Sequence, residues 1–219
     1  MNMKKRYLVG VLAAVSVVSF LTAETVMAAA GGDKMNYGQL KVGMIQPSGD
    51  QDDAGYDTGG DFSAAYGRHL NKFLVLEGAI DLFGSGQDSS GYNSHAGYYD
   101  QDTTLSGAAL LVTLKGEFSS GPVDLFAGAG VGLYSVLLDS EIDSTYYGDL
   151  DADDSDGVFG AHVVAGINYN INDRFFVGME GRYRWTDDVE LSDTVASIPV
   201  EYYGDLSGFV VTFNGGIRF

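Results

Sequence analysis

The sequence predicts an all-β protein, an eight-stranded antiparallel up-and-down transmembrane β-barrel that follows a cleaved signal peptide. Three observations lead to this fold class. Stretches of about ten residues alternate between apolar and polar side chains, as expected for strands with one face in lipid. The connections between these stretches alternate between short and long, as in an up-and-down barrel. The long connections are rich in Asp and Glu and contain no Lys or Arg.

The composition excludes several classes of protein. The chain has 219 residues, with 12 Lys+Arg against 30 Asp+Glu and a formal net charge of −18. We expect no nucleic-acid partner, because phosphate backbones attract surfaces rich in Lys and Arg. The absence of Cys excludes disulfides, thiolate nucleophiles and a lipidated N-terminal Cys. Aromatic residues make up 12% of the chain, which argues against disorder.

Residues 1–28 are predicted to be a signal peptide, which leaves 29–219 as one barrel domain. A basic start at residues 4–6 precedes an apolar run over 7–21, and small residues follow at the expected cleavage position. Cleavage is expected after Ala28 or after one of the two alanines that follow it. The apolar run is shorter than the roughly 20 residues that a spanning helix needs, so an uncleaved anchor is the less favoured alternative.

Eight segments carry the alternating pattern, and each is expected to be one barrel strand. They cover 37–47, 60–70, 73–83, 104–118, 122–136, 158–170, 174–187 and 206–219. The four long connections are 48–61, 84–103, 138–157 and 187–205, and they hold 22 of the 30 acidic residues. We expect them to be extracellular loops, with the three short turns and the N-terminal end in the periplasm. Hydration of polar loops alone would explain the acids but not the complete exclusion of bases.

The alternation assigns one uncharged face to lipid and the other to the barrel interior. On the fifth segment the lipid-facing set is Val123, Leu125, Ala127, Ala129, Val131 and Leu133. Aromatic residues near the segment ends suit the two interfacial girdles of a barrel. The second segment departs from the pattern, because Arg68 shares the outward face of Phe62, Ala64 and Tyr66. We place Arg68 at the periplasmic interface, where its long side chain reaches water.

The same alternation sends charged residues of both signs into the lumen. This predicted lumen network comprises Lys41, Glu77, Asp81, Lys115, Glu117, Asp124, Glu180, Arg182, Arg184 and Arg218. Side chains fill an eight-stranded barrel, and buried charges must pair to offset their desolvation. We favour a salt-bridged plug without an open pore. A polar lining or a rearranging gate that passes small solutes is the alternative.

The last segment alternates apolar residues up to a C-terminal Phe. The residues of this pattern are Phe209, Val211, Phe213, Ile217 and Phe219, with Gly215 as a departure. Here the sequence resembles the small outer-membrane β-barrel proteins of Gram-negative bacteria, the group of the OmpA transmembrane domain, OmpX and OmpW. The resemblance implies an integral outer-membrane location, contact with outer-membrane lipid and lipopolysaccharide, and recognition of the terminal pattern by the barrel-assembly machinery. It covers everything after the leader and selects no subfamily.

Candidate catalytic and metal-binding residues are few. Some enzymes of this architecture, lipid A deacylases, pair a His with a Ser two residues on. Asn71, Gly97 and Val164 occupy the corresponding positions after the three His of this chain. Weak Ca²⁺ candidates lie in the third long connection, at Asp149, Asp151, Asp153, Asp154 and Asp156. An EF-hand starting at Asp149 would need Gly at 154 and Glu at 160, so this motif is not met.

These inferences favour a non-enzymatic outer-membrane protein with a structural or surface-interaction role, a salt-bridged lumen and acidic extracellular loops. We expect a monomer, no cofactor, and divalent cations as an additional partner of the acidic loops. One alternative is a narrow porin or an OmpW-like channel for small or hydrophobic solutes. Another alternative is a soluble exported β-sandwich that acts as a binding module.

Overall fold

The computed structural model describes residues 35–48, 57–93, 97–144, 148–195 and 198–219. The predicted signal peptide lies outside these ranges. The strands are β1 (Asn36–Pro47), β2 (Gly59–His69), β3 (Leu74–Asn93), β4 (Gly97–Ser120), β5 (Val123–Ser144), β6 (Gly148–Asn170), β7 (Phe175–Thr186), β8 (Val189–Val195), β9 (Ile198–Gly204) and β10 (Gly208–Arg218). Among the described residues, no helix is long and apolar enough to cross a membrane.

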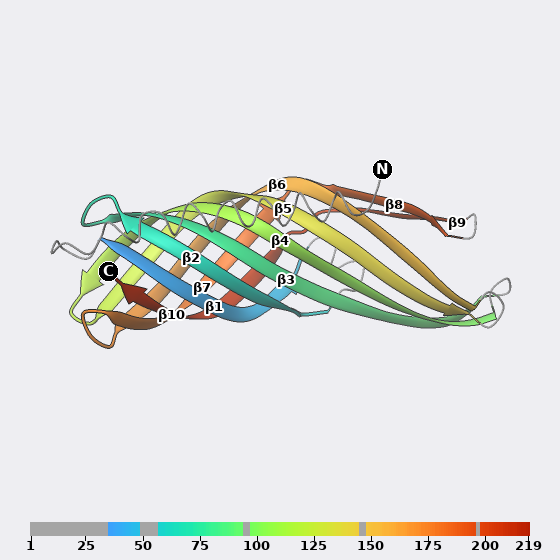
Figure 1. The fold of residues 1–219 in the computed structure, drawn as a ribbon, viewed down its shortest axis with the longest axis horizontal. Helices are drawn as coiled ribbons and strands as arrows, with labels where there is room; N and C mark the ends of the chain where they lie inside the picture. Colours follow the sequence, from blue (N-terminus) through green and yellow to red (C-terminus); the bar gives the residue numbers. More distant parts are fainter. Residues whose placement is uncertain (1–34, 49–56, 94–96, 145–147, 196–197) are drawn as a thin grey trace.

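Eight strands close into an antiparallel barrel in the order β1-β10-β7-β6-β5-β4-β3-β2 (Figure 1). Closure is made by the first and last strands, which pair from Tyr37 opposite Arg218 to Pro47 opposite Gly208. A closed barrel pairs its backbone groups internally and leaves no sheet edge in lipid. The fold class predicted from the sequence is confirmed, and the β-sandwich alternative is wrong because the strands form one closed sheet.

Two of the expected long loops are strands instead. β3, β4, β5 and β6 have 20, 24, 22 and 23 residues and continue as paired hairpins through most of 84–103 and 138–157. The pattern that marked the barrel segments was an apolar outward face, and this face is required only within lipid. Backbone pairing does not need it, so the strands extend beyond the point at which the sequence signal stops.

The fourth long connection, 187–205, also contains regular structure. It forms the separate two-stranded sheet of β8 and β9, paired from Val189 opposite Gly204 to Val195 opposite Ile198. In the first long connection, 49–56 lies outside the described residues, and β2 begins already at Gly59. The hairpin extensions and this small sheet all lie at one end of the barrel (Figure 1).

The short turns at the other end are fixed by local side-chain and backbone chemistry. Gly121 has φ of 62° ahead of Pro122, the arrangement of a tight hairpin turn that places Gly at its first central position. The Asn71 side-chain oxygen accepts hydrogen bonds from the backbone N–H groups of Phe73 (2.8 Å) and Leu74 (3.0 Å). The Asn172 side-chain oxygen accepts in the same way from the N–H groups of Arg174 and Phe175.

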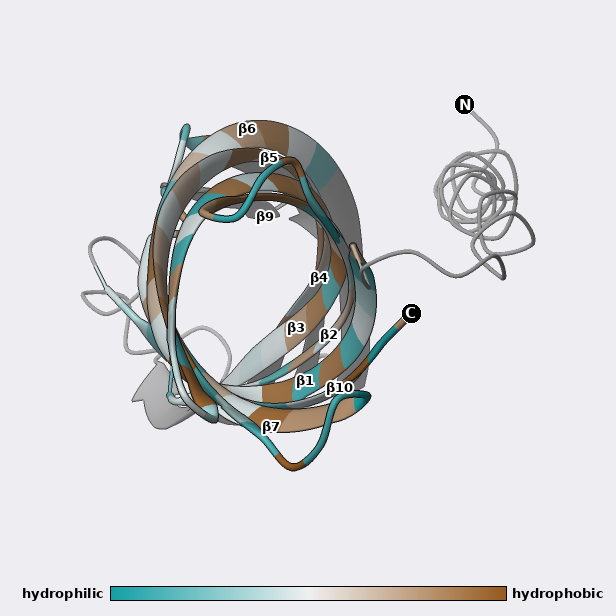
Figure 2. Ribbon diagram, turned by 90° about the vertical axis from the view of Figure 1, so that its left-hand side faces the viewer, coloured by the Kyte–Doolittle hydropathy of each residue, from teal (hydrophilic) through white to brown (hydrophobic). Residues whose placement is uncertain are grey.

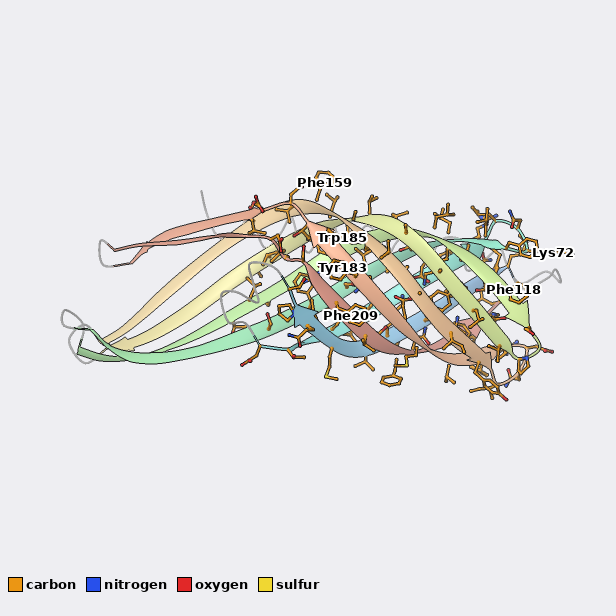
Figure 3. All side chains as sticks on the ribbon, turned by 180° about the vertical axis from the view of Figure 1, so that it is seen from behind. Lys72, Phe118, Phe159, Tyr183, Trp185 and Phe209 are labelled. Carbon is orange, nitrogen blue, oxygen red and sulfur yellow. The ribbon has the colours of Figure 1, made fainter. Side chains whose placement is uncertain are left out.

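The outward face of the barrel is apolar and exposed. On β5 and β6 the exposed set includes Val131 (62%) and Phe159 (66%), while alternate residues are buried. Figure 2 shows brown, apolar segments distributed around the wall, and Figure 3 places Phe159 and Trp185 at one level and Phe118 near the opposite end. From Tyr169 to Phe159 a strand advances ten residues, which spans roughly 25 Å at the usual strand tilt. This height matches the hydrocarbon core that an outer-membrane barrel crosses.

A charge within this band should destabilise the barrel, and the same charge above it should not. Val163→Arg places a guanidinium on the exposed face midway between the two aromatic levels, at an expected cost of about 2–4 kcal/mol. Leu137→Arg lies on the same outward face, four residues beyond the Phe159 level, and should cost no more than about 1 kcal/mol. Urea unfolding in lipid vesicles measures both. Equal destabilisation by the two variants would contradict this placement of the membrane.

Candidate functional site

Four charged side chains meet at the centre of the lumen. Lys41 on β1 and Lys115 on β4 each contact both Glu77 on β3 and Glu180 on β7. The Nζ–Oε distances are 3.0 and 2.8 Å for Lys41 and 2.8 and 3.0 Å for Lys115. All four side chains are at least 95% buried. They form a ring of alternating charge that joins strands from different parts of the wall, and we call it the charge tetrad.

Neighbouring side chains complete the coordination of the charge tetrad. The Tyr37 hydroxyl and the Gln39 amide nitrogen (2.9 Å) both donate to Oε2 of Glu77. The Lys115 ammonium lies 4.6 Å from the centre of the Phe126 ring. Burying an ionised carboxylate is tolerated only where such donors satisfy its oxygens. Glu77 is therefore the most fully coordinated acid of the lumen.

A second pairing lies on the hairpin side of the charge tetrad. Arg182 on β7 extends across the lumen to Asp61 on β2, with Nη2 at 3.4 Å from Oδ2, and to Asp81 on β3. Nearby, His162 Nε2 and the Thr113 hydroxyl lie 2.8 Å apart. A Cβ at Gly130 would come within 2.6 Å of this imidazole, so the glycine opposite His162 makes room for its ring.

Arg184, two residues further along β7, has a different environment. Its guanidinium carbon lies 4.1 Å from the centre of the Phe83 ring and 5.5 Å from that of Tyr134. Its Nε donates to the backbone carbonyl of Leu206, at 2.8 Å. Among the residues that the structure describes, no carboxylate lies within ion-pair distance of it.

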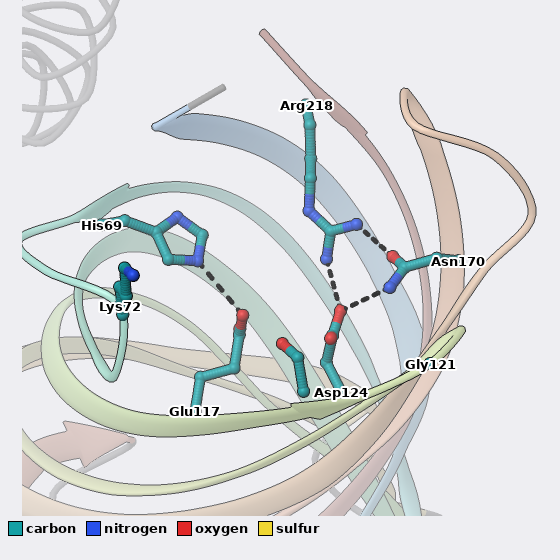
Figure 4. A pocket seen from close by; sticks show the side chains of 8 residues that line it. His69, Lys72, Glu117, Gly121, Asp124, Asn170 and Arg218 are labelled. Atoms are coloured by element: carbon teal, nitrogen blue, oxygen red, sulfur yellow. Dashed lines mark hydrogen bonds and ion pairs between the residues drawn. The ribbon is translucent and has the colours of Figure 1, made fainter. Parts of the chain in front are cut away.

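The short-turn end of the lumen opens into a polar pocket of about 360 Å³, shown in Figure 4. Arg218 binds Asp124 (2.7 Å) and the side-chain oxygen of Asn170, and this amide also donates to Asp124 at 2.7 Å. On the opposite side His69 Nε2 lies 3.1 Å from a Glu117 oxygen. The Lys72 side chain also lines the pocket.

Two buried apolar layers lie on either side of these charges along the barrel. Above the short-turn pocket, Tyr37, Val75 and Phe176 form one buried cluster. At the hairpin end, Leu206 and Val189 are fully buried in a second cluster with residues of the barrel wall. The charged pairs therefore lie between two buried apolar clusters along the barrel.

The structure places all ten residues of the predicted lumen network on the inward face. It brings eight of them together with a Lys, Arg, Asp or Glu of opposite charge, Glu117 contacts His69, and Arg184 is the exception. The predicted lumen network omitted Asp61, because this acid was counted with the first long connection (48–61) although the second segment (60–70) also includes it. The alternation of that segment places Phe62 outward and therefore Asp61 inward, so the existing pattern was sufficient to find it. The alternation on β1 likewise places Tyr37 and Gln39 on the face that lines the lumen.

The Ca²⁺ candidates lie on β6 and not in a loop. Alternation along a strand divides these positions between two faces, with 149, 151 and 153 on one and 154 and 156 on the other. Asp156 accepts a hydrogen bond from the Gly157 N–H, at 2.7 Å. In the described part of the chain no group of three or more potential metal ligands occurs. His95 lies outside the described residues.

The C-terminal pattern occupies the outward face of β10. Phe209 and Phe213 are exposed, and Phe219 exchanges backbone hydrogen bonds with Asn36 at 2.9 and 3.2 Å. The terminal residue therefore completes the seam between the first and last strands.

Comparison with known proteins identifies the family. The model of the outer membrane protein beta-barrel domain matches residues 12–203. The chain belongs to this family. Its location is accordingly the outer membrane, where short turns face the periplasm and long hairpins face the outside.

Solved structures of outer-membrane barrels agree with the fold. OprG from Pseudomonas aeruginosa has a TM-score of 0.61 at 12% identity, over 86% of this chain and 98% of its own. A major outer membrane protein from Thermus thermophilus has a TM-score of 0.51 at 11% identity, over 84% and 99%. Neisserial surface protein A has 17% identity and a TM-score of 0.47, over 84% and 97%. The comparison with curated proteins gave no match.

Removal of one charge from the charge tetrad should be far more costly than removal of a pair. Glu77→Leu leaves two buried ammonium groups with one carboxylate, and we expect a loss of about 3–5 kcal/mol in unfolding free energy. The double variant Glu77→Leu with Lys115→Leu leaves Lys41 paired to Glu180 at 2.8 Å. It should recover most of that loss, measured by urea unfolding in vesicles. If the double variant is as unstable as the single one, charge balance is not what holds the lumen.

Proposed function

We propose that this outer-membrane barrel is a non-enzymatic, closed envelope protein that acts through its fold in the membrane and its surface hairpins. The single observation that carries the proposal is the filling of the lumen by paired charges and buried apolar side chains. The charge tetrad occupies its centre, and apolar layers around Phe176 and around Leu206 lie on either side. Such an interior supports the barrel wall and offers solutes no continuous path.

The electrostatics of the lumen favour the closed state. An ion that passes must separate Lys41 and Lys115 from Glu77 and Glu180, or fit between groups that are already within 3.0 Å of each other. Breaking a buried pair exposes uncompensated charge in a medium of low dielectric, at a cost of about 3–5 kcal/mol. The same pairing supports a non-enzymatic role, because these acids and bases are neutralised by one another.

The surface role is supported by the charge of the projecting hairpins. Strand register places Asp88 opposite Asp102, Asp102 opposite Glu141, and Glu141 opposite Asp151, which makes one row across four strands. Like charges directly opposite each other destabilise a sheet. Divalent cations shared with lipopolysaccharide phosphates would offset this repulsion, and we propose both as partners at the outer surface.

Two further partners belong to the proposal. The barrel-assembly machinery would read the alternating C-terminal residues that end at Phe219. In the membrane the closed sheet needs no second copy to pair its edges, so we propose a monomer. The strongly acidic outer surface also makes nucleic acid an unfavourable partner.

A narrow channel is the second candidate, and one observation favours it. Several buried lumen atoms near the charge tetrad make no hydrogen bond with the described residues, including Ser63 Oγ, Thr212 Oγ1 and His162 Nδ1. Polar groups of this kind suit the lining of a path for small solutes. The path would require the Leu206 layer to move.

A planar bilayer separates the two candidates. After heat-dependent gel migration has verified folding, the refolded mature barrel should give no reproducible conductance steps, because the charge tetrad and both apolar layers block the lumen. An exposed control, Leu82→Ala on the lipid face, should be equally silent. Steps that change in size when Arg182 or Glu180 is replaced would contradict the closed barrel and establish the channel.

The assembly proposal has its own test in cells. Deletion of Phe219 removes the end of the C-terminal pattern and two backbone hydrogen bonds to Asn36. We expect several-fold less folded barrel in the outer membrane, measured by heat-dependent gel migration of membrane fractions. Refolding of the purified variant into detergent should be much less affected. A matched loss in both assays would show that the residue serves stability and is not a recognition signal.

A further inference from the structure

Arg184 combines burial with an unusual lack of charge partners. Only 1% of the residue is exposed, and within the described part of the chain it alone among the lumen bases has no carboxylate within 4.0 Å. Its Nη1 is buried and makes no hydrogen bond with any described residue. A buried guanidinium is costly unless an acceptor or an anion meets it. The geometry thus leaves an unused cationic donor at the outer end of the lumen.

The space above this guanidinium is apolar. Leu206 belongs to one buried cluster with Val189 on β8 and with the wall residues Leu105, Val136 and Val158. We call Leu105, Val136, Val158 and Val189 the apolar collar. The Tyr134 ring belongs to the same cluster, and its hydroxyl is buried without a hydrogen-bond partner among the described residues. A dry ring of side chains therefore lies directly next to a cation and an unused hydroxyl.

Leu206 itself shows how a ligand would fit. Its carbonyl oxygen accepts the hydrogen bond of Arg184 Nε, at 2.8 Å, while its side chain is fully buried in the cluster that includes the apolar collar. One residue thus supplies an oxygen to the guanidinium and a branched aliphatic group to the collar. A short aliphatic carboxylic acid would present the same two groups to the site. In Leu206 a neutral carbonyl, which is a weaker acceptor, stands where the carboxylate of such an acid would bind.

The segment that carries Leu206 lies outside the barrel ladder. Between β9 and β10, Leu206 N–H donates to the Thr186 hydroxyl (2.7 Å), and the Ser207 carbonyl accepts from Ser48 N–H (2.9 Å). The Ser207 N–H also donates to the Asp205 side chain, at 2.9 Å, and the Leu206 side chain packs into the buried cluster. An outward movement of this segment would expose the collar and Arg184 from the outer side without breaking any pairing between barrel strands.

We propose that the outer end of the lumen is a binding site for a small aliphatic monocarboxylate, with Leu206 as its built-in competitor. The carboxylate binds Arg184, with the Tyr134 hydroxyl as a second donor, and the aliphatic body takes the place of the Leu206 side chain in the collar. A charged oxygen makes a stronger hydrogen bond to a guanidinium than a peptide carbonyl does. Asp61 and Asp81 both pair with Arg182 through Oδ2, and in the described part of the chain neither lies within 4.0 Å of Arg184, although each keeps one buried oxygen without a hydrogen bond.

Isovalerate is the probe, because it carries the aliphatic group of a leucine side chain on a carboxylate. Titration of the folded mature barrel in lipid nanodiscs, followed by calorimetry, should show weak binding to the unaltered protein. Leu206→Ala removes the side chain that fills the apolar collar but keeps the backbone carbonyl, and it should tighten isovalerate binding at least tenfold. Leu82→Ala, an equal truncation on the lipid face, should bind like the unaltered protein.

Two analogues test the two halves of the site on the same Leu206→Ala barrel. Isovaleramide lacks the negative charge, acetate lacks the aliphatic body, and each should bind at least tenfold more weakly than isovalerate. Arg184→Gln in this background should abolish the preference for isovalerate over the amide. The proposal is overturned if the folded Leu206→Ala barrel binds no isovalerate, or if amide or acetate binds as tightly. These analogue comparisons decide the matter even where the Arg184 variant fails to fold.

Discussion

Burial of charge in a narrow interior is the constraint on which the rest of this structure depends. Side chains fill an eight-stranded barrel, so its inward charges must find partners across the lumen. Lys41 and Lys115 do so by bridging Glu77 and Glu180, which come from strands separated along the sequence and around the wall. The interior therefore acts as a polar cross-link between opposite parts of the sheet, whereas the lipid-facing side chains of the same strands have no such internal partners.

The arrangement of charges along the barrel axis follows from the same constraint. Arg218 and Asp124 occupy the wet pocket at the periplasmic end, where solvent lowers the cost of their charges. The charge tetrad lies beyond the Tyr37 and Phe176 layer and depends on ideal pairing. Arg184 lies at the outer end and relies on aromatic faces and one carbonyl oxygen. Solvent therefore assists the first pair, carboxylates satisfy the bases of the charge tetrad, and Arg184 has only a neutral acceptor and aromatic faces.

The alternation of residues predicted the number of strands, their faces and the inward charges, because the membrane imposes a strict apolar rule on one face. Asp61 was missed because it was counted with the first long connection, although the alternation of its segment places it inward. The hairpin extensions of β3 to β6 were missed where that rule fades, since strands in water need no apolar face. No pattern in the sequence indicated the role of Leu206. Its contacts with Arg184 and the apolar collar join distant segments, and no local periodicity records them.

The unequal strand lengths give the rim an oblique shape. β3 to β6 have 20 to 24 residues, while β1, β2, β7 and β10 have 11 or 12. Ten further residues of strand amount to roughly 25 Å of wall above the membrane on one side, at the same strand tilt. The wall is lined by carboxylates and shields that side of the mouth, which stays low along the other four strands. The approach to the segment that carries Leu206 is therefore asymmetric: the tall wall of β3 to β6 bounds one side of the mouth, and the small β8–β9 sheet projects at the same end beside β6.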